Sequence, residues 1–115
     1  MANTFKVVTK AGVTSADVIY TAGSGVTAIV LGLILGNTTT SQITSTVTLS
    51  SDTSSRAGAN DEANQAVELI TDAPIPAGSS LELLSGNKVV LETTDTIEVT
   101  GSGATDVALS IMEIT

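Results

Sequence analysis

The sequence predicts an all-β protein, a single-domain β-sandwich of about eight or nine short antiparallel strands. Three observations support this fold class. Thr, Ser, Val and Ile are abundant while strong helix formers are sparse. Apolar residues alternate with a period of two in several segments, and no long helical period appears. Turn signals recur at short intervals. One domain over residues 1–115 fits this length, and the pattern is compatible with a jelly-roll order without specifying strand order.

The first half of the chain divides into four predicted strands separated by turns. We expect strands over 4–9, 17–21, 26–36 and 42–51. Glycines mark the turn at 22–25, because they take positive φ angles without steric cost. The polar run 37–41 separates the third strand from the fourth.

The third predicted strand, 26–36, is apolar on both sides. Strict alternation puts Val26, Ala28, Val30 and Ile34 on one side, and Ile29, Leu31, Leu33 and Leu35 on the other. One sandwich core covers only one side of a strand. The other side is either covered by a loop or a closed barrel within the subunit, or it forms a subunit interface. The interface interpretation assigns six contact residues, Ile29, Leu31, Leu33, Leu35, Met112 and Ile114.

The longest interruption, about 52–65, has a small, polar composition that predicts a flexible loop. Either it is simply a solvated surface loop, or it contacts a partner through Arg56, Asp61 and Glu62. A strand over 66–71 follows. The next segment contains Pro74 and Pro76, which remove two N–H donors, so we expect a rigid corner outside the sheets with Ile75 inserted into the core.

The last third of the chain predicts a hairpin, a further strand and a closing strand. Segments 79–84 and 88–92 form the expected hairpin about 85–87, and residues near 97–99 form the next strand. In the closing strand, 106–114, Val107, Leu109 and Ile111 share one side. Met112 and Ile114 fall on the other, which predicts a bulge or a second contact surface near the end.

Composition excludes several function classes. The chain has no cysteine and no histidine, so Cys/His zinc sites and His-activated nucleophiles are excluded. The formal net charge is −8 and the four basic residues are not clustered, which argues against direct nucleic-acid binding. The apolar run 26–35 is too short to span a bilayer, and the N-terminal residues do not resemble a secretion signal. We therefore expect no enzyme activity, cofactor, metal or membrane partner.

Two sets of carboxylates are candidate sites. Asp52, Asp61 and Glu62 offer oxygen ligands for calcium, but their spacing does not match an EF-hand, and solvated loop carboxylates explain them better. Asp95 and Glu98 could form an acid–base pair for glycoside hydrolysis. Turn capping at Asp95 and an outward strand position at Glu98 are the simpler interpretation.

Several short segments of the sequence are similar to segments found in a known family. They are Leu31-Gly32-Leu33 followed by Asn37-Thr38-Thr39, then the segments 73–81 (APIPAGSSL), 88–92 (KVVLE) with Asp95 and Ile97, and 109–114 (LSIMEI). Over about 26–51 and 66–115 the chain resembles small all-β structural proteins of tailed phages, especially cyanophages. The loop 52–65 has no counterpart in this resemblance.

The resemblance implies membership of a virion assembled in the host cytoplasm. It suggests a capsid decoration, or cement, protein that forms a homo-oligomer, with a trimer expected, and contacts the major capsid protein or other virion proteins. A neck, tail or fibre component is the first alternative. A carbohydrate-binding adhesin module is the second, disfavoured because the chain has only two aromatic residues, Phe5 and Tyr20.

Overall fold

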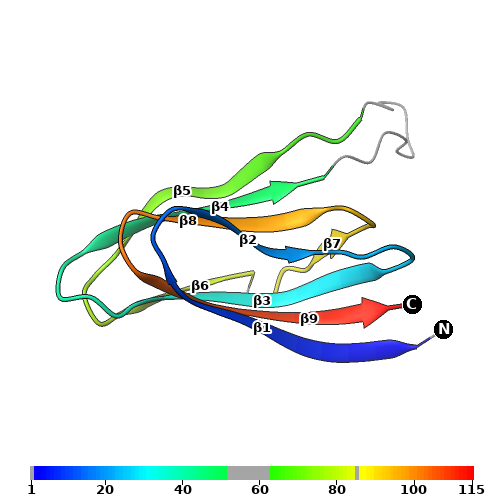
Figure 1. Cartoon of the computed structure of the whole chain (residues 1–115), viewed down its shortest axis with the longest axis horizontal. Helices are drawn as coiled ribbons and strands as arrows, with labels where there is room; N and C mark the ends of the chain where they lie inside the picture. The colour runs from blue at the N-terminus through cyan, green and yellow to red at the C-terminus, as the bar shows by residue number, and fades with distance from the viewer. Residues whose placement is uncertain (1, 52–62, 85) are drawn as a thin grey trace.

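Two antiparallel sheets facing each other make up the described part of the chain. The computed structural model describes residues 2–51, 63–84 and 86–115, and within these ranges it contains nine strands (Figure 1). They are β1 (Asn3–Val13), β2 (Ala16–Thr21), β3 (Thr27–Asn37), β4 (Ile43–Ser50), β5 (Val67–Ile75), β6 (Ser80–Leu83), β7 (Val89–Leu91), β8 (Thr96–Gly101) and β9 (Thr105–Ile114). Sheet A has the order β1-β9-β3-β6, with β7 also paired to β3, and sheet B has the order β2-β8-β4-β5.

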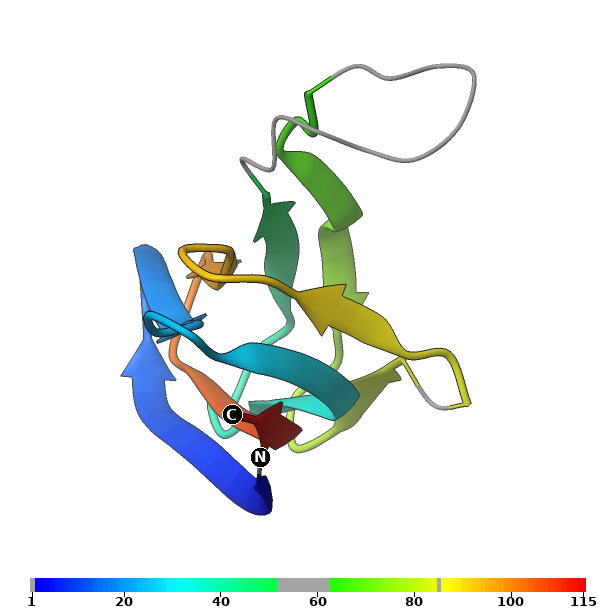
Figure 2. The same cartoon turned by 90° about the vertical axis from the view of Figure 1, so that its right-hand side faces the viewer.

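The strand pairing is that of a jelly roll. β1 pairs with β9, β2 with β8, β3 with β6 and β7, and β4 with β5, as expected when a long two-stranded ribbon is rolled over on itself. The pairs β3–β9 and β4–β8 then join the two halves of the ribbon within sheet A and sheet B, respectively. Figures 1 and 2 show the two layers, with β1, β9, β3 and β6 on one side and β2, β8, β4 and β5 on the other. The predicted all-β sandwich is confirmed, and its strand order is jelly-roll.

Aliphatic side chains from both sheets fill the space between the layers. Val30, Leu109 and Ile111 from sheet A are fully buried, as are Val47 and Val99 from sheet B. The alternation of β4 is regular, because Ile43, Ser45 and Val47 are buried while the intervening threonines are half-buried. The core is therefore built almost without aromatic rings, by interdigitated β-branched and Leu side chains.

The hairpin predicted about 85–87 is wrong. β6 and β7 do not pair with each other. Both run antiparallel to β3 and lie one after the other along it, with Leu83 opposite Leu33 and Val89 opposite Val30. Leu84 and Gly86 have positive φ angles, 62° and 84°, which interrupt the extended backbone between the two short strands. The long strand β3 offers enough edge for both.

The corner predicted at Pro74 and Pro76 begins later than expected. β5 continues beyond Thr71 through Pro74, which lies opposite Thr44 of β4, and ends at Ile75. Proline is tolerated there because β5 is the outermost strand of sheet B, so the missing N–H removes no bond to a further strand. Ile75 is fully buried, which confirms its predicted insertion into the core.

The two ends of the described chain lie side by side. The Ala2 N–H donates to the Thr115 carbonyl oxygen at 3.2 Å, and the Thr115 N–H donates back to the Ala2 carbonyl at 3.0 Å. This reciprocal pair extends the β1–β9 ladder to its last residue (Figure 1). Both ends therefore leave the domain at one corner of sheet A.

Candidate functional site: the outer face of sheet A

A β-bulge at Leu31 decides which side chains of β3 are buried. Val30 lies opposite Ile111 of β9 and Gly32 lies opposite Ser110, so Leu31 has no partner in the ladder. An extra residue on one strand reverses the alternation of the residues that follow it. Val30 before the bulge is fully buried, and Leu33 after it is 1% exposed.

The bulge corrects the interface predicted from strict alternation. Leu33 and Leu35 were expected on the contact surface, but both lie in the core between the sheets, at 1% and 0% exposure. Ile34 was expected on the core side, but it is 45% exposed and turns away from sheet B. Of the two alternatives predicted for the end of the closing strand, the bulge lies on β3 instead, opposite Ser110 and Ile111 of β9, while Met112 and Ile114 do lie on the side opposite Leu109 and Ile111.

The outer face of sheet A, meaning the side turned away from sheet B, carries a continuous apolar row. Phe5 of β1 lies opposite Met112 of β9, which lies opposite Ile29 of β3, which lies opposite Val90 of β7. These four residues, the Phe5 row, run across four strands. Phe5 is 72% exposed and Val90 57%, while Ile29 and Met112 are half-buried.

Further apolar side chains extend this surface on both sides of the Phe5 row. Ile114 is half-buried at one end of the face, opposite Thr27. In the other direction Val7 is 64% exposed, and Leu31 is half-buried at the bulge. Four of the six residues predicted for the interface, Ile29, Leu31, Met112 and Ile114, are therefore on this face. Whether a partner covers them stays a prediction.

Sequence reasoning missed four of the most exposed members of this surface, Phe5, Val7, Ile34 and Val90. The alternation of Phe5 and Val7 within the first predicted strand was available as a signal. This alternation indicates an apolar surface only once the pairing of β1 with β9 is known, because that pairing places Phe5 beside Met112. That long-range register is not contained in the local pattern.

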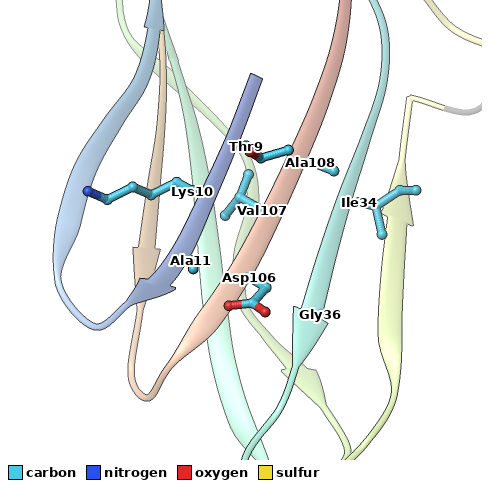
Figure 3. Close-up of a pocket in the computed structure, with 8 residues that line it drawn as sticks. All are labelled: Thr9, Lys10, Ala11, Ile34, Gly36, Asp106, Val107 and Ala108. Carbon is cyan, nitrogen blue, oxygen red and sulfur yellow. The ribbon is translucent and has the colours of Figure 1, made fainter. Parts of the chain in front are cut away.

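Two shallow depressions flank Ile34 on this face. The larger, about 340 Å³, is lined by Thr9, Lys10, Ala11, Ile34, Gly36, Asp106, Val107 and Ala108 (Figure 3). The smaller, about 190 Å³, is lined by Leu31, Gly32, Leu33, Ile34, Glu82 and Leu83. Gly36 and Ala108 keep the floor of the larger depression low, because neither presents a side chain beyond Cβ. The space suits an apolar side chain of a partner.

The ionisable groups at the larger depression are already engaged. The Asp106 carboxylate accepts a hydrogen bond from the Gly12 N–H at 2.9 Å. The Lys10 side chain extends away from Ile34, and its ammonium group lies 3.8 Å from the Asp17 carboxylate of β2 (Figure 3). The depression therefore offers shape and apolar surface rather than a pair of groups suited to acid–base chemistry.

A second polar cluster joins the sheets near the chain ends. The Tyr20 hydroxyl of β2 donates to one oxygen of the Glu113 carboxylate at 2.6 Å, and the Lys6 ammonium of β1 lies 2.7 Å from the other. These hydrogen bonds, that from Lys6 first, hold the pKa of Glu113 below its usual value. Burial, with the neighbouring carboxylate, raises the pKa of Tyr20 above its usual value. The cluster ties β1 and β9 to β2.

The other carboxylates considered from sequence have structural roles or lie outside the described residues. Asp95 is 2% exposed, and its carboxylate accepts hydrogen bonds from the Glu92 N–H and the Ser51 hydroxyl, both at 3.0 Å. This is the capping arrangement expected of a turn residue. Glu98 is half-buried within β8. The loop candidates Asp52, Arg56, Asp61 and Glu62 fall outside the described residues.

Residues 2–51, 63–84 and 86–115 contain no group of three or more acidic side chains close enough to hold a metal ion. The same residues include no helix with the length and apolar character needed to cross a membrane.

Comparisons with known proteins give one structural likeness. No family model matches the chain, and no curated protein matches it. Among solved structures, it is similar to a chain from Bacillus endospore appendages, described as a novel family of disulfide-linked pili. The identity is 16%, the match covers 99% of this chain and 87% of that chain, and the TM-score is 0.47. A likeness at this level assigns no family, so the phage resemblance inferred from the sequence stays a prediction.

Proposed function

We propose that this chain is a non-enzymatic structural subunit that self-associates through the outer face of sheet A. The observation that carries the proposal is the set of exposed apolar side chains on that face, Phe5, Val7, Ile34 and Val90, with exposures from 45% to 72%. Contiguous apolar surface on a soluble domain is typical of an interaction site. Completing the burial of these four side chains contributes on the order of 5 kcal/mol per subunit.

The absence of catalytic activity is part of the proposal. Among the described residues, the three carboxylates with the most specific surroundings each have a structural partner. Glu113 is held by Lys6 and Tyr20, Asp95 caps a turn, and Asp106 accepts a backbone N–H. Because each is engaged in fixing the backbone or joining the sheets, these groups favour a structural role over an acid–base site.

The finer proposal is a capsid decoration protein of a tailed-phage virion, assembled in the host cytoplasm. It rests on the short sequence segments that resemble tailed-phage structural proteins. Jelly-roll domains are common in viral shells, which is an analogy at the level of fold alone. The net charge of −8 suits a position outside the DNA-filled shell, because an acidic protein is repelled by the packaged phosphates. The partners would be further copies of this chain and the major capsid protein.

A neck, tail or fibre component is the alternative within the same class, because the same surface could assemble a ring or a spike base. The number of copies per particle separates the two. Quantitative mass spectrometry of purified particles should find hundreds of copies of a decoration protein and about a dozen or fewer of a neck or tail protein. A glycan array tests the adhesin alternative, and clear, competable binding would favour it.

Light scattering coupled to size-exclusion chromatography, over a range of protein concentrations, tests the structural proposal. We expect a mass above that of the 11.5 kDa monomer that rises with concentration. A protein that stays monomeric at millimolar concentration, and that also fails to bind virion particles, would show that the exposed face is not an assembly surface.

A further inference from the structure

We propose that a second copy of this chain covers the outer face of sheet A about a twofold axis, with the Phe5 ring of each copy seated in the larger depression of the other. The inference rests on the proposed self-association and specifies its geometry. It follows from three features of one surface: a protruding ring, a matching depression, and the distribution of charge between them.

The ring and the depression lie at opposite ends of the same face. Phe5 is opposite Met112 on β9, while the depression is floored by Ala108, four residues further along β9. At about 3.4 Å per residue the two are separated by about 14 Å along the strand. Phe5, the most exposed large apolar residue among the described residues, and a depression of about 340 Å³ thus form one self-complementary pair.

A twofold axis satisfies both contacts at once. An axis lying in the plane between two facing sheets and running across the strands through Val7 and Ser110 exchanges the two ends of the face. Phe5 of one copy then meets the depression of its partner, and the reverse contact follows by symmetry. Ser110 and Gly32 lie opposite each other on this central line, and the exposed Val7 on the same line would meet Val7 of the partner.

The charges of the face favour this arrangement. The acidic residues of the face, Asp106 and Glu82, lie near the depression, while the Phe5 row is uncharged. Exchanging the ends places Asp106 of one copy over Ile114 of its partner, the residue that pairs with Asn3. It also places Glu82 over the row of Val90, next to the exposed Lys88. In a chain with net charge −8, this avoids stacking acidic groups on each other.

The sheet edges are less suited to pairing than the face. β1 is the outermost strand at one edge of sheet A and carries Lys6 and Lys10, two of the four basic residues in the chain. β5 is the outermost strand of sheet B and contains Pro74 and register shifts against β4. Lysines, proline and bulges on outer strands discourage strand addition. At these two outer strands, therefore, the addition of a second copy is less favoured than stacking on the face.

The size of the face predicts a concentration-dependent dimer. The face extends about 27 Å along β1, from Asn3 to Ala11, and about 15 Å across four strands, or roughly 400 Å² of projected area. A standard stable interface buries about 800 Å² per partner. We therefore expect a dissociation constant in the micromolar range or weaker, with the two Phe5 rings contributing most.

Isotope-filtered NMR on an equal mixture of labelled and unlabelled protein tests the geometry. Phe5 is the only phenylalanine, so its ring signals are unambiguous. We expect intermolecular NOEs from the Phe5 ring to the methyl groups of Thr9 and Ala108, which line the depression next to each other. Within one subunit the ring and Ala108 are about 14 Å apart, too far for an NOE.

A variant pair measures the energetic contribution of the ring. Phe5→Ser should raise the dimer dissociation constant on the order of 100-fold or more, because two buried rings leave each interface. Val18→Ser is the matched control, since Val18 is 48% exposed and lies opposite Glu98 on the outer side of sheet B. It should leave the dissociation constant within about twofold. Both variants should keep the wild-type pattern of amide chemical shifts outside the substituted row.

The outcomes separate this inference from the proposed function. Self-association with Phe5 NOEs only to the Phe5 row of a neighbour, and a mass of three copies, would overturn the twofold geometry. It would support the trimer that the resemblance implies and would leave the structural role intact. Equal weakening by Phe5→Ser and Val18→Ser would also overturn the twofold geometry. A strict monomer at millimolar concentration would overturn the twofold geometry and remove the main support for the structural role.

Discussion

Substitutions on either side of the bulge should show that the buried set of β3 changes from even to odd residue numbers at Leu31. Before the bulge Val30 is fully buried and its neighbour Ile29 is half-buried on the outer face. After it, Leu33 is 1% exposed and its neighbour Ile34 is 45% exposed. Four alanine variants, one at each of these positions, therefore test directly whether the buried positions switch from even to odd numbers at Leu31.

The expected costs follow from these exposures. Leu33→Ala removes a side chain from the closed core and should lower the free energy of unfolding by about 3 kcal/mol, within the usual range for buried leucine. Val30→Ala should cost about 2 kcal/mol for the same reason. Ile34→Ala gives up only the buried part of its side chain and should cost about 1 kcal/mol or less, and Ile29→Ala should cost less than Val30→Ala.

Urea unfolding measures these costs. The protein is held at a concentration at which light scattering finds monomer only, so that losses at the outer face do not include lost self-association. Provided the slope of free energy against urea is unchanged, the shift in midpoint reports the change in stability. Strict alternation puts Ile34 in the core and Leu33 outside. If Ile34→Ala proves as costly as Leu33→Ala, or costlier, the assignment of the bulge to Leu31 is refuted.

Three further predictions concern other parts of the domain. The folded-state pKa of Glu113 is lowered from 4.5, so its hydrogen bonds to Lys6 and Tyr20 stabilise the fold above about pH 4.5, and this contribution is lost as pH falls through the folded-state pKa. Urea midpoints measured from pH 3 to 7 should therefore decline less steeply on the acid side for Glu113→Gln than for wild type, and identical slopes would contradict this role. A Cβ added at Gly101 would lie 2.5 Å from a backbone carbonyl oxygen, whereas one at Gly32 meets nothing within 4 Å. Gly101→Ala should therefore cost at least about 2 kcal/mol in unfolding experiments, while Gly32→Ala should be nearly neutral for the monomer, and equal effects would refute the close approach. The buried Asn37 side chain donates to two backbone carbonyls and accepts from the N–H and hydroxyl of Thr39. Asn37→Leu should destabilise the protein by about 2–4 kcal/mol because these groups lose partners, and a loss under about 1 kcal/mol would contradict that.

Local patterns predicted most of the strands but not how two of them pair. The segments rich in β-branched residues were found because alternation and turn residues are local features. The pairing of β6 and β7 with β3 was missed, since the turn residues at 85–87 signal a break without specifying a hairpin. The extension of β5 through Pro74 was missed because proline is excluded only from inner strands, and the outer position of β5 depends on the whole topology.

The sequence correctly predicted a second apolar surface, but it identified only some of the residues on that surface. The excess of apolar residues in 26–36 correctly indicated a second apolar side of that strand. Which residues occupy it depends on a single unpaired residue, Leu31, and no local preference marks a bulge there. Phe5 was overlooked because its significance comes from Met112, more than a hundred positions away in the chain and directly opposite in the sheet.

The reciprocal hydrogen bonds between Ala2 and Thr115 have a practical consequence for handling this protein. Any affinity tag or fused reporter attached at either end emerges at one corner, a single ladder step from the Asn3–Ile114 pair and two more from Phe5. Such an attachment would obstruct stacking of two copies regardless of the end chosen. Circular permutation offers a remedy: a short linker joining 115 to 2, with new ends opened between β4 and β5, would move the attachment point from sheet A to sheet B and leave the contact surface clear.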